Sequence, residues 1–235
     1  MKWPVQRILA CACLGLACQP TLCATACVDA EVVIDMRVAP VFAEAVLSAT
    51  LRGTLVQAAF GSLDTEVAVG AGVDGAFTAA GARETAFLVQ AIDPAATPVD
   101  PIRAALVIVA GGKPVRVFET GLGQRLGGAL PGLGTGGNDA LVVLAESYGM
   151  GQSSLRLAVV EVASTALVER AGFDAARVDA CDDARFGGFV EAIRVSRCEG
   201  EADPARWQAE RLRAACVDGR APPAAAFGPA VKGKP

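Results

Sequence analysis

The sequence predicts a mainly β protein of antiparallel sheets, arranged as part of a propeller or as a sandwich, with a helix near the C-terminus. Short apolar runs, several of them alternating with polar residues, recur from residue 63 onward. Glycine-rich turns separate neighbouring runs, which is typical of hairpins. Only near residue 204 does the spacing of apolar residues become that of a helix.

Length and composition limit the class of protein. The chain has 235 residues, of which 53% are hydrophobic, enough for a sizeable core in one domain or two small ones. It contains no histidine, which excludes histidine-based catalytic triads, metal sites and general bases. The formal net charge of −4 argues against a nucleic-acid partner.

Residues 1–26 have the pattern of a secretory signal peptide. Lys2 and Arg7 form a positive start, residues 8–17 are apolar, and Ala24-Thr25-Ala26 is a cleavage site of small residues. The sequence therefore predicts an exported protein, periplasmic or extracellular, with cleavage after Ala26.

Cleavage would leave four cysteines, and an even number in an exported protein indicates two disulfides. We expect Cys181 to pair with Cys216, because a hairpin of residues 177–183 with 188–194 and a returning C-terminal helix would bring them together. Cys198 is then left for Cys27. In the alternative, Cys27 is a lipidated first residue, and only in that case would the protein bind a membrane.

Residues 27–62 form an N-terminal segment, with a strand over 32–38 and a helix within 40–59, where Pro40 suits a helix start. Residues 63–218 form the β domain. Its expected strands are 66–71, 85–91, 105–110, 114–120, 141–146, 155–162, 165–169 and 189–195.

The end of the chain changes character. Asp203 is a suitable N-cap and Pro204 a suitable first helical residue, so the pattern predicts a helix over 204–216 with Trp207, Leu212 and Ala215 on its buried side. Residues 219–235 contain four prolines and three glycines and almost no large apolar residues, which indicates a disordered tail.

A weak internal repeat relates two parts of the β domain. Gly75-Ala76-Phe77 and the strand after it correspond to residues 134–143 when Thr85 is placed against Ala140. A glycine-rich turn, a polar step and an apolar strand resemble the repeats of FG-GAP or VCBS β-propeller proteins. That resemblance implies blade-like sheets, but the calcium loops are not intact, since Asp74-Gly75 and Asn138-Asp139 are only fragments of one.

Two further patterns suggest ligands without matching a known site. The glycines of residues 121–137 invite a phosphate-loop interpretation, but an apolar strand follows them instead of a helix, so a flexible connection is expected. Asp179, Asp182 and Asp183 could offer oxygen to a hard cation, but a solvated turn fits them better. We therefore expect no metal and no cofactor.

Without histidine, acid–base chemistry would need carboxylates. Glu146 is the leading candidate, because Ser147 and Tyr148, the only tyrosine, follow it in a hairpin loop where a site could open. The other carboxylates in or beside expected strands are Glu119, Glu161 and Glu169. The sequence favours a non-enzymatic binding or structural module of the cell envelope, with an envelope protein or a glycan as partner. The alternative is a cofactor-free secreted hydrolase that uses carboxylates near Glu146.

Overall fold

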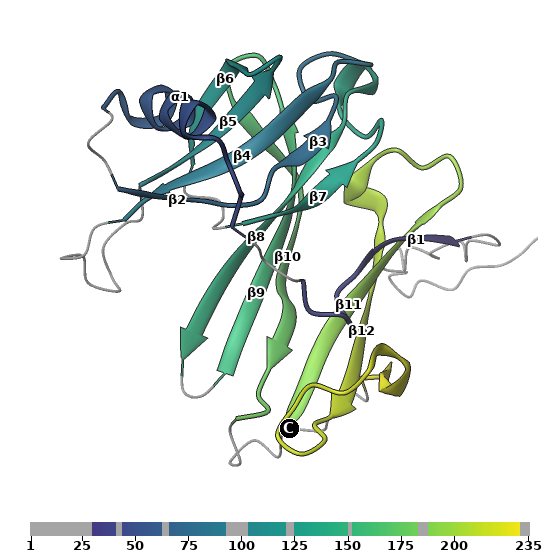
Figure 1. Cartoon of the computed structure of the whole chain (residues 1–235). Helices are drawn as coiled ribbons and strands as arrows, with labels where there is room; N and C mark the ends of the chain where they lie inside the picture. Colours follow the sequence, from purple (N-terminus) through teal and green to yellow (C-terminus); the bar gives the residue numbers. More distant parts are fainter. Residues whose placement is uncertain are drawn as a thin grey trace, which may run out of the picture.

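Two antiparallel sheets and one α-helix make up the described part of the chain (Figure 1). The computed structural model describes residues 30–40, 44–62, 66–92, 103–120, 125–149, 152–182 and 188–230. The expected class, mainly β with antiparallel sheets, is confirmed. The expected signal peptide and Cys27 lie outside the described residues.

The smaller sheet has five strands in the order β2-β4-β5-β6, with β3 beside β4. Its strands are β2 (Val67–Val69), β3 (Val73–Gly75), β4 (Glu84–Ala91), β5 (Ala104–Ala110) and β6 (Lys113–Thr120). Gly111 and Gly112 join β5 to β6 with φ values of 56° and 77°, which glycine adopts without a steric penalty. The hairpin expected at these glycines is therefore present.

Helix α1 (Ala49–Phe60) covers the outer face of the smaller sheet. It begins where the Ser48 hydroxyl accepts a hydrogen bond from the N–H of Leu51, and it ends at Gly61 in the left-handed conformation. Leu55 and Val56 are buried in a cluster that also contains Val89 and Val107 of the sheet. Burial against the sheet thus secures a helix that the sequence indicated only within residues 40–59.

The larger sheet has eight strands in the order β13-β12-β11-β10-β9-β8-β7, with β1 also paired to β11. Its strands are β1 (Ala30–Asp35), β7 (Arg125–Leu130), β8 (Ala140–Gly149), β9 (Gln152–Val162), β10 (Leu167–Asp179), β11 (Phe189–Cys198), β12 (Gln208–Ala215) and β13 (Gly228–Pro229). The described loops contain the 3₁₀ turns η1 (Thr135–Gly137), η3 (Pro204–Arg206) and η4 (Ala224–Ala226).

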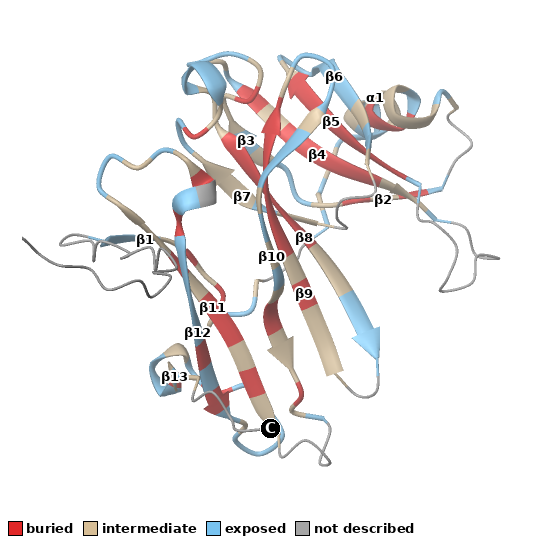
Figure 2. Ribbon diagram, turned by 180° about the vertical axis from the view of Figure 1, so that it is seen from behind, coloured by how far each residue is buried: buried red, intermediate tan, exposed pale blue. Residues whose placement is uncertain are grey.

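The two sheets share a hydrophobic core, so the fold contains a sandwich. Leu106 and Ile108 of β5 lie in the same buried cluster as Leu141 and Val143 of β8. Figure 2 shows buried positions on both sheets where they meet. This core matches the sandwich alternative of the sequence prediction.

The larger sheet divides at β10 and β11. These strands pair only near one end, over Arg177–Asp179, and the other half of β11 pairs with β1 instead. The register of β10 shifts between Phe173 and Arg177, where Ala175 has a φ of 49°. β11 and β12 therefore diverge from β8, β9 and β10 (Figures 1 and 2).

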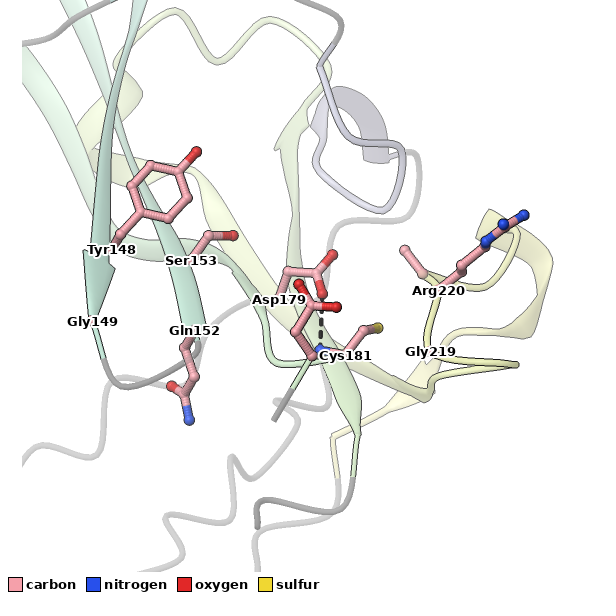
Figure 3. Close-up of a pocket in the computed structure, with 10 residues that line it drawn as sticks. Tyr148, Gly149, Gln152, Ser153, Asp179, Cys181, Gly219 and Arg220 are labelled. Carbon is pink, nitrogen blue, oxygen red and sulfur yellow. Dashed lines mark hydrogen bonds between the residues drawn. The ribbon is translucent and has the colours of Figure 1, made fainter. Parts of the chain in front are cut away.

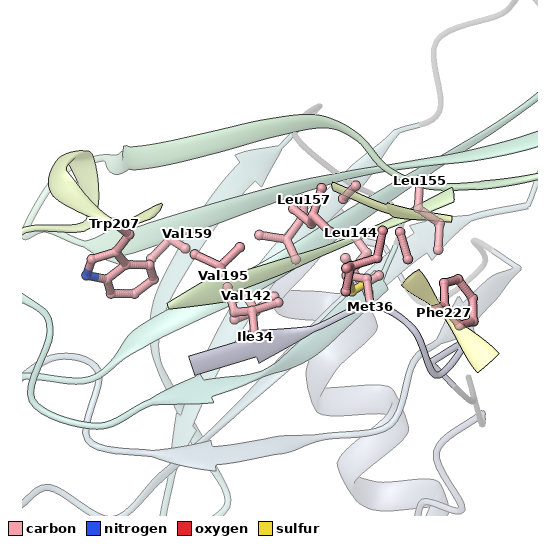
Figure 4. Packing of buried hydrophobic residues seen from close by; sticks show 14 of the residues in the cluster. Ile34, Met36, Val142, Leu144, Leu155, Leu157, Val159, Val195, Trp207 and Phe227 are labelled. Atoms are coloured by element: carbon pink, nitrogen blue, oxygen red, sulfur yellow. The ribbon is translucent and has the colours of Figure 1, made fainter. Parts of the chain in front are cut away.

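A second core occupies the other face of this bent sheet. Leu144 and Leu157 lie in one buried cluster with Ile34 of β1, with Val195 of β11 and with Trp207 (Figure 4). Burying a large apolar side chain of this kind stabilises a fold by about 1.5–3 kcal/mol. The core thus holds the two arms of the divided sheet together.

The expected helix over residues 204–216 is wrong. Pro204–Arg206 forms a single 3₁₀ turn, and Gln208–Ala215 is strand β12, paired with β11 from Phe189↔Ala215 to Ser196↔Gln208. Leu212 and Ala214 are buried while Arg211 and Arg213 are exposed, which is the period of two that a strand requires. Ladder hydrogen bonds and burial outweigh the helical preference of the segment.

The expected disordered tail over residues 219–235 is wrong as far as residue 230. Strand β13 pairs with β12 through Leu212↔Pro229 and Arg213↔Gly228, and the Phe227 ring is buried in the second core. One aromatic side chain in an otherwise small and proline-rich segment therefore anchors it to the sheet. Residues 231–235 lie outside the described part of the chain.

Candidate functional site

Glu146 and Tyr148 lie two residues apart on β8, so their side chains point to the same face of the sheet. The Tyr148 side chain is 76% exposed, whereas that of Glu146 is only 14% exposed. Hydrogen bonding with the Glu146 carboxylate raises the pKa of the Tyr148 hydroxyl. Arg125 of β7 forms an ion pair with Glu146 at 3.6 Å.

Tyr148 borders an open pocket of about 710 Å³ at the ends of β8, β9 and β10. Figure 3 shows Tyr148 and Ser153 on one side, Gly219 and Arg220 on the other, and Asp179 with Cys181 between them. Gln152 and Asp182 also border it, but Glu146 does not. We refer to this space as the Tyr148 pocket. The structure thus brings one of the two predicted residues to the pocket and places the other behind it.

Asp179 is the best-held acidic group of the Tyr148 pocket. One of its carboxylate oxygens accepts a hydrogen bond from the N–H of Cys181 at 3.1 Å. The other lies 3.6 Å from a guanidinium nitrogen of Arg177, whose side chain is buried and donates to the carbonyl oxygens of Met36 and Arg37. Burial lowers the pKa of Arg177. These contacts fix the carboxylate of Asp179 on one wall of the pocket.

A disulfide joins two walls of the Tyr148 pocket. The sulfur atoms of Cys181 and Cys216 are 2.04 Å apart and their Cα atoms 5.6 Å apart. Cys181 follows the acidic wall, and Cys216 precedes the turn that contains Arg220. The pairing is the predicted one, although a strand and not a helix brings Cys216 there. Cys198 is disulfide-bonded as well.

Gly188 lies beneath this disulfide at the start of β11. It has a φ of 55°, and a Cβ atom added to it would lie 3.6 Å from the Cβ of Cys216. The N–H of Cys216 donates to the carbonyl of Gly188, and the N–H of Ala180 donates to that of the next residue, Phe189. Strands β10 and β12 are therefore linked across the end of β11.

The sequence indicated some residues of this pocket and gave no indication of others. It marked Asp179 and Asp182 only as candidate cation ligands, and it assigned Arg220 to a tail. Gln152 lies in the loop of the expected hairpin, and this loop is where the sequence suggested that a binding site could open. Nothing in the sequence indicated that residue 220 would face the end of β10.

Asp183, one of the acidic residues that the sequence suggested as a cation ligand, lies outside the described residues. The described residues contain no group of three or more candidate metal ligands. The carboxylate of Asp139 accepts hydrogen bonds from the N–H groups of Ala76 and Gly132, at 2.8 and 3.0 Å. It therefore satisfies donors of the chain itself. None of the described helices is long and apolar enough to cross a membrane.

Comparison with protein-family models, curated proteins and solved structures gives no match for this chain. The resemblance to FG-GAP or VCBS repeats stays a prediction. The pocket itself offers a planar aromatic ring, carboxylate acceptors, and donors from Gln152, Ser153 and Arg220. Such a set suits reversible binding of a polar ligand.

Proposed function

We propose that the protein is an exported, non-enzymatic binding module of the cell envelope that takes a hydroxyl-rich ligand, such as a glycan, in the Tyr148 pocket. The observation that carries this proposal is the mixture of groups around the pocket. Tyr148 exposes its ring, Asp179 and Asp182 accept hydrogen bonds, and Gln152 and Arg220 donate them.

A sugar hydroxyl is both a donor and an acceptor, so it pairs with either kind of group. The C–H face of a sugar ring is apolar and suits the face of an exposed aromatic side chain. A simple anion would meet two carboxylates in this pocket, and a simple cation would meet Arg220. A neutral, hydroxylated ligand therefore fits this wall chemistry better than either ion.

Glu146 supports the binding role from behind the pocket. Its carboxylate raises the pKa of the Tyr148 hydroxyl and forms an ion pair with Arg125 at 3.6 Å. An exposed ring whose freedom is limited by a neighbouring side chain loses less freedom when a ligand covers it, which favours affinity. Glu146 thus acts as a positioning residue for Tyr148.

Export fits the disulfides, because they persist in oxidising compartments. N-terminal sequencing of the protein from its native host is the test. We expect Cys27 as the first residue. A blocked Cys27 with the mass of acyl chains would establish the lipoprotein alternative, and a mature chain that keeps Met1 would overturn export.

NMR titration tests the binding proposal directly. Tyr148 is the only tyrosine of the chain, so its ring signals can be assigned without ambiguity. We expect one or more neutral oligosaccharides from a panel of cello-, malto- and chito-trioses to shift these signals saturably. Tyr148→Phe should keep most of the affinity, and Tyr148→Ala should lose about tenfold or more, equivalent to roughly 1.4 kcal/mol. Unshifted signals with the whole panel would contradict a glycan site.

The same titration separates binding from hydrolysis. Asp179→Asn should weaken binding of a trisaccharide if the pocket only binds it. If the protein is the alternative hydrolase, the wild type should instead release shorter sugars, and carboxylate replacements should abolish that release. Glu146→Gln belongs in this comparison, because the hydrolase alternative rests on that residue.

A further inference from the structure

A second pocket lies at the other end of β9, away from the Tyr148 pocket. It has a volume of about 480 Å³ and is bordered by Arg116 of β6, Glu161 of β9, Arg170 of β10 and the loop of Thr135 and Asn138. Both sheets and the glycine-rich loop of the sequence analysis therefore contribute to it. We refer to it as the Arg116 pocket.

Glu161 organises one wall of the Arg116 pocket. The residue is only 6% exposed, and its carboxylate accepts hydrogen bonds from the N–H of Thr135 at 3.0 Å and from Arg170 at 2.8 Å. Hydrogen bonds from Thr135 and the charge of Arg170 hold the pKa of Glu161 below its usual range, against the opposing effect of burial. Each carboxylate oxygen already accepts a hydrogen bond, so Glu161 positions Thr135 and Arg170. Other side chains of the pocket would have to bind a ligand.

The glycine-rich loop thus binds an anion, but that anion is a side chain of the protein. The loop turns at Gly136, which has a φ of 76° and a ψ of 14°. This turn presents the N–H of Thr135 to Glu161 and brings Asn138 to the pocket. The loop is therefore ordered by Glu161 and does not form the helix N-terminus that a phosphate loop needs.

Arg116 leaves the pocket with an excess of positive charge. Its cross-strand partner is the buried Ile108, so the side chain lies on the face of β6 that is turned toward the larger sheet. Within the described residues it forms no ion pair, and its recorded bond runs to the carbonyl of Val115. Arg170 forms an ion pair with Glu161, whereas no acidic residue in the described part of the chain pairs with Arg116.

We propose that the Arg116 pocket binds an oxyanion, a phosphate or a carboxylate group, between the guanidinium groups of Arg116 and Arg170. Guanidinium groups bind such anions through paired N–H donors, and both of these side chains are accessible from solvent. Asn138 and Ser164 add neutral donors. Val162 and Val168 supply an apolar wall, which suits an anion that carries a hydrocarbon portion.

NMR titration at constant ionic strength tests this site on the full-length mature protein. The probes are sodium phosphate and sodium hexanoate, and the signals are the amides of Thr135 and Asn138. We expect saturable shifts with at least one probe. Phosphate preference assigns the site to phosphoryl groups, and hexanoate preference assigns it to organic carboxylates. Absence of saturation by both probes overturns the proposal.

Two variants separate a site from general charge effects. Arg116→Gln should weaken the binding of the probe about tenfold, because it removes a guanidinium that forms no ion pair within the described residues. Lys113→Gln removes one positive charge from the same exposed strand outside the pocket, and it should change affinity less than twofold. If both variants weakened the affinity for the probe equally, long-range electrostatic attraction would explain the effect and the proposed site would be overturned. The result is independent of the Tyr148 pocket.

Discussion

Several carboxylates in this protein serve as internal hydrogen-bond acceptors. Glu84 is buried and accepts from the N–H groups of Phe77 and Thr78, and from the Thr78 hydroxyl. Asp139 does the same for Ala76 and Gly132. Backbone donors in these connections would otherwise be left unpaired or would need water. The Asn138-Asp139 fragment that resembles part of a calcium loop therefore has a structural explanation.

Replacing Asp139 should destabilise the fold. Asp139→Ala removes the acceptor of two N–H donors, and the loss falls mainly on the part-buried donor of Ala76, at a cost of about 1–3 kcal/mol. Urea denaturation should show this loss, whereas Asp74→Asn, at an exposed position, should stay within about 0.5 kcal/mol of the wild type.

The melting temperature of the wild type should barely differ between chelator and millimolar calcium. A rise of many degrees with calcium would instead show that these acidic residues bind the ion.

Glu161 should make stability depend on pH in the acid range. Its pKa is depressed in the folded state, so its contribution is complete above the ordinary value of 4.5 and is lost as pH falls through the folded-state value. The free energy of unfolding should therefore fall more steeply below pH 4.5 in the wild type than in Glu161→Gln. The exposed Glu119→Gln is the control and should keep the steep profile. Parallel profiles for wild type and Glu161→Gln would contradict this assignment.

At the scale of elements, local signals predicted the hairpins well and the C-terminal element badly. Gly111 and Gly112 define their turn through their own conformation, so the sequence contains the necessary information. For β12, alanine, arginine and glutamate favour a helix, and Asp203-Pro204 resembles a helix start. The decisive partner is β11, which supplies the full ladder of β12 and is not visible in the local pattern.

Two adjacent alanines distinguish a strand from a helix at β12. Ala214 is 6% exposed in the second core, whereas Ala215 is exposed. Ala214→Gln should therefore destabilise the protein by about 1–3 kcal/mol, because it forces an amide into an apolar cluster. Ala215→Gln should be nearly neutral in the same denaturation experiment. The helical interpretation places Ala215 on the buried side. A larger loss of stability in Ala215→Gln than in Ala214→Gln would therefore support a helix and contradict the strand.

At the scale of the whole molecule, the sequence predicted the sheets but could not predict how the larger one divides. The division depends on β1 and β10 sharing the two ends of β11 and on the buried Arg177, whose guanidinium binds the carbonyl oxygens of Met36 and Arg37. These contacts join residues about 140 positions apart in sequence. The Tyr148 pocket likewise joins residues that are distant in sequence, and of these Tyr148 follows a locally predicted strand whereas Arg220 has no local signal.

The Cys181–Cys216 disulfide should contribute to both stability and binding. It encloses a sequence separation of 35 residues, and a loop of this size corresponds to about 3–4 kcal/mol in the chain-entropy model. Replacing both cysteines by alanine should lower the free energy of unfolding by about 2–4 kcal/mol.

The same replacement should weaken ligands of the Tyr148 pocket, because Asp179 and Arg220 lie on the two walls that the disulfide joins. The Arg116 pocket, at the other end of β9, should keep its affinity and so reports whether the variant is folded. Non-reducing peptide mapping of the wild type checks the premise. A linkage of Cys198 to either Cys181 or Cys216 would contradict it, because these two cysteines could then not be bonded to each other.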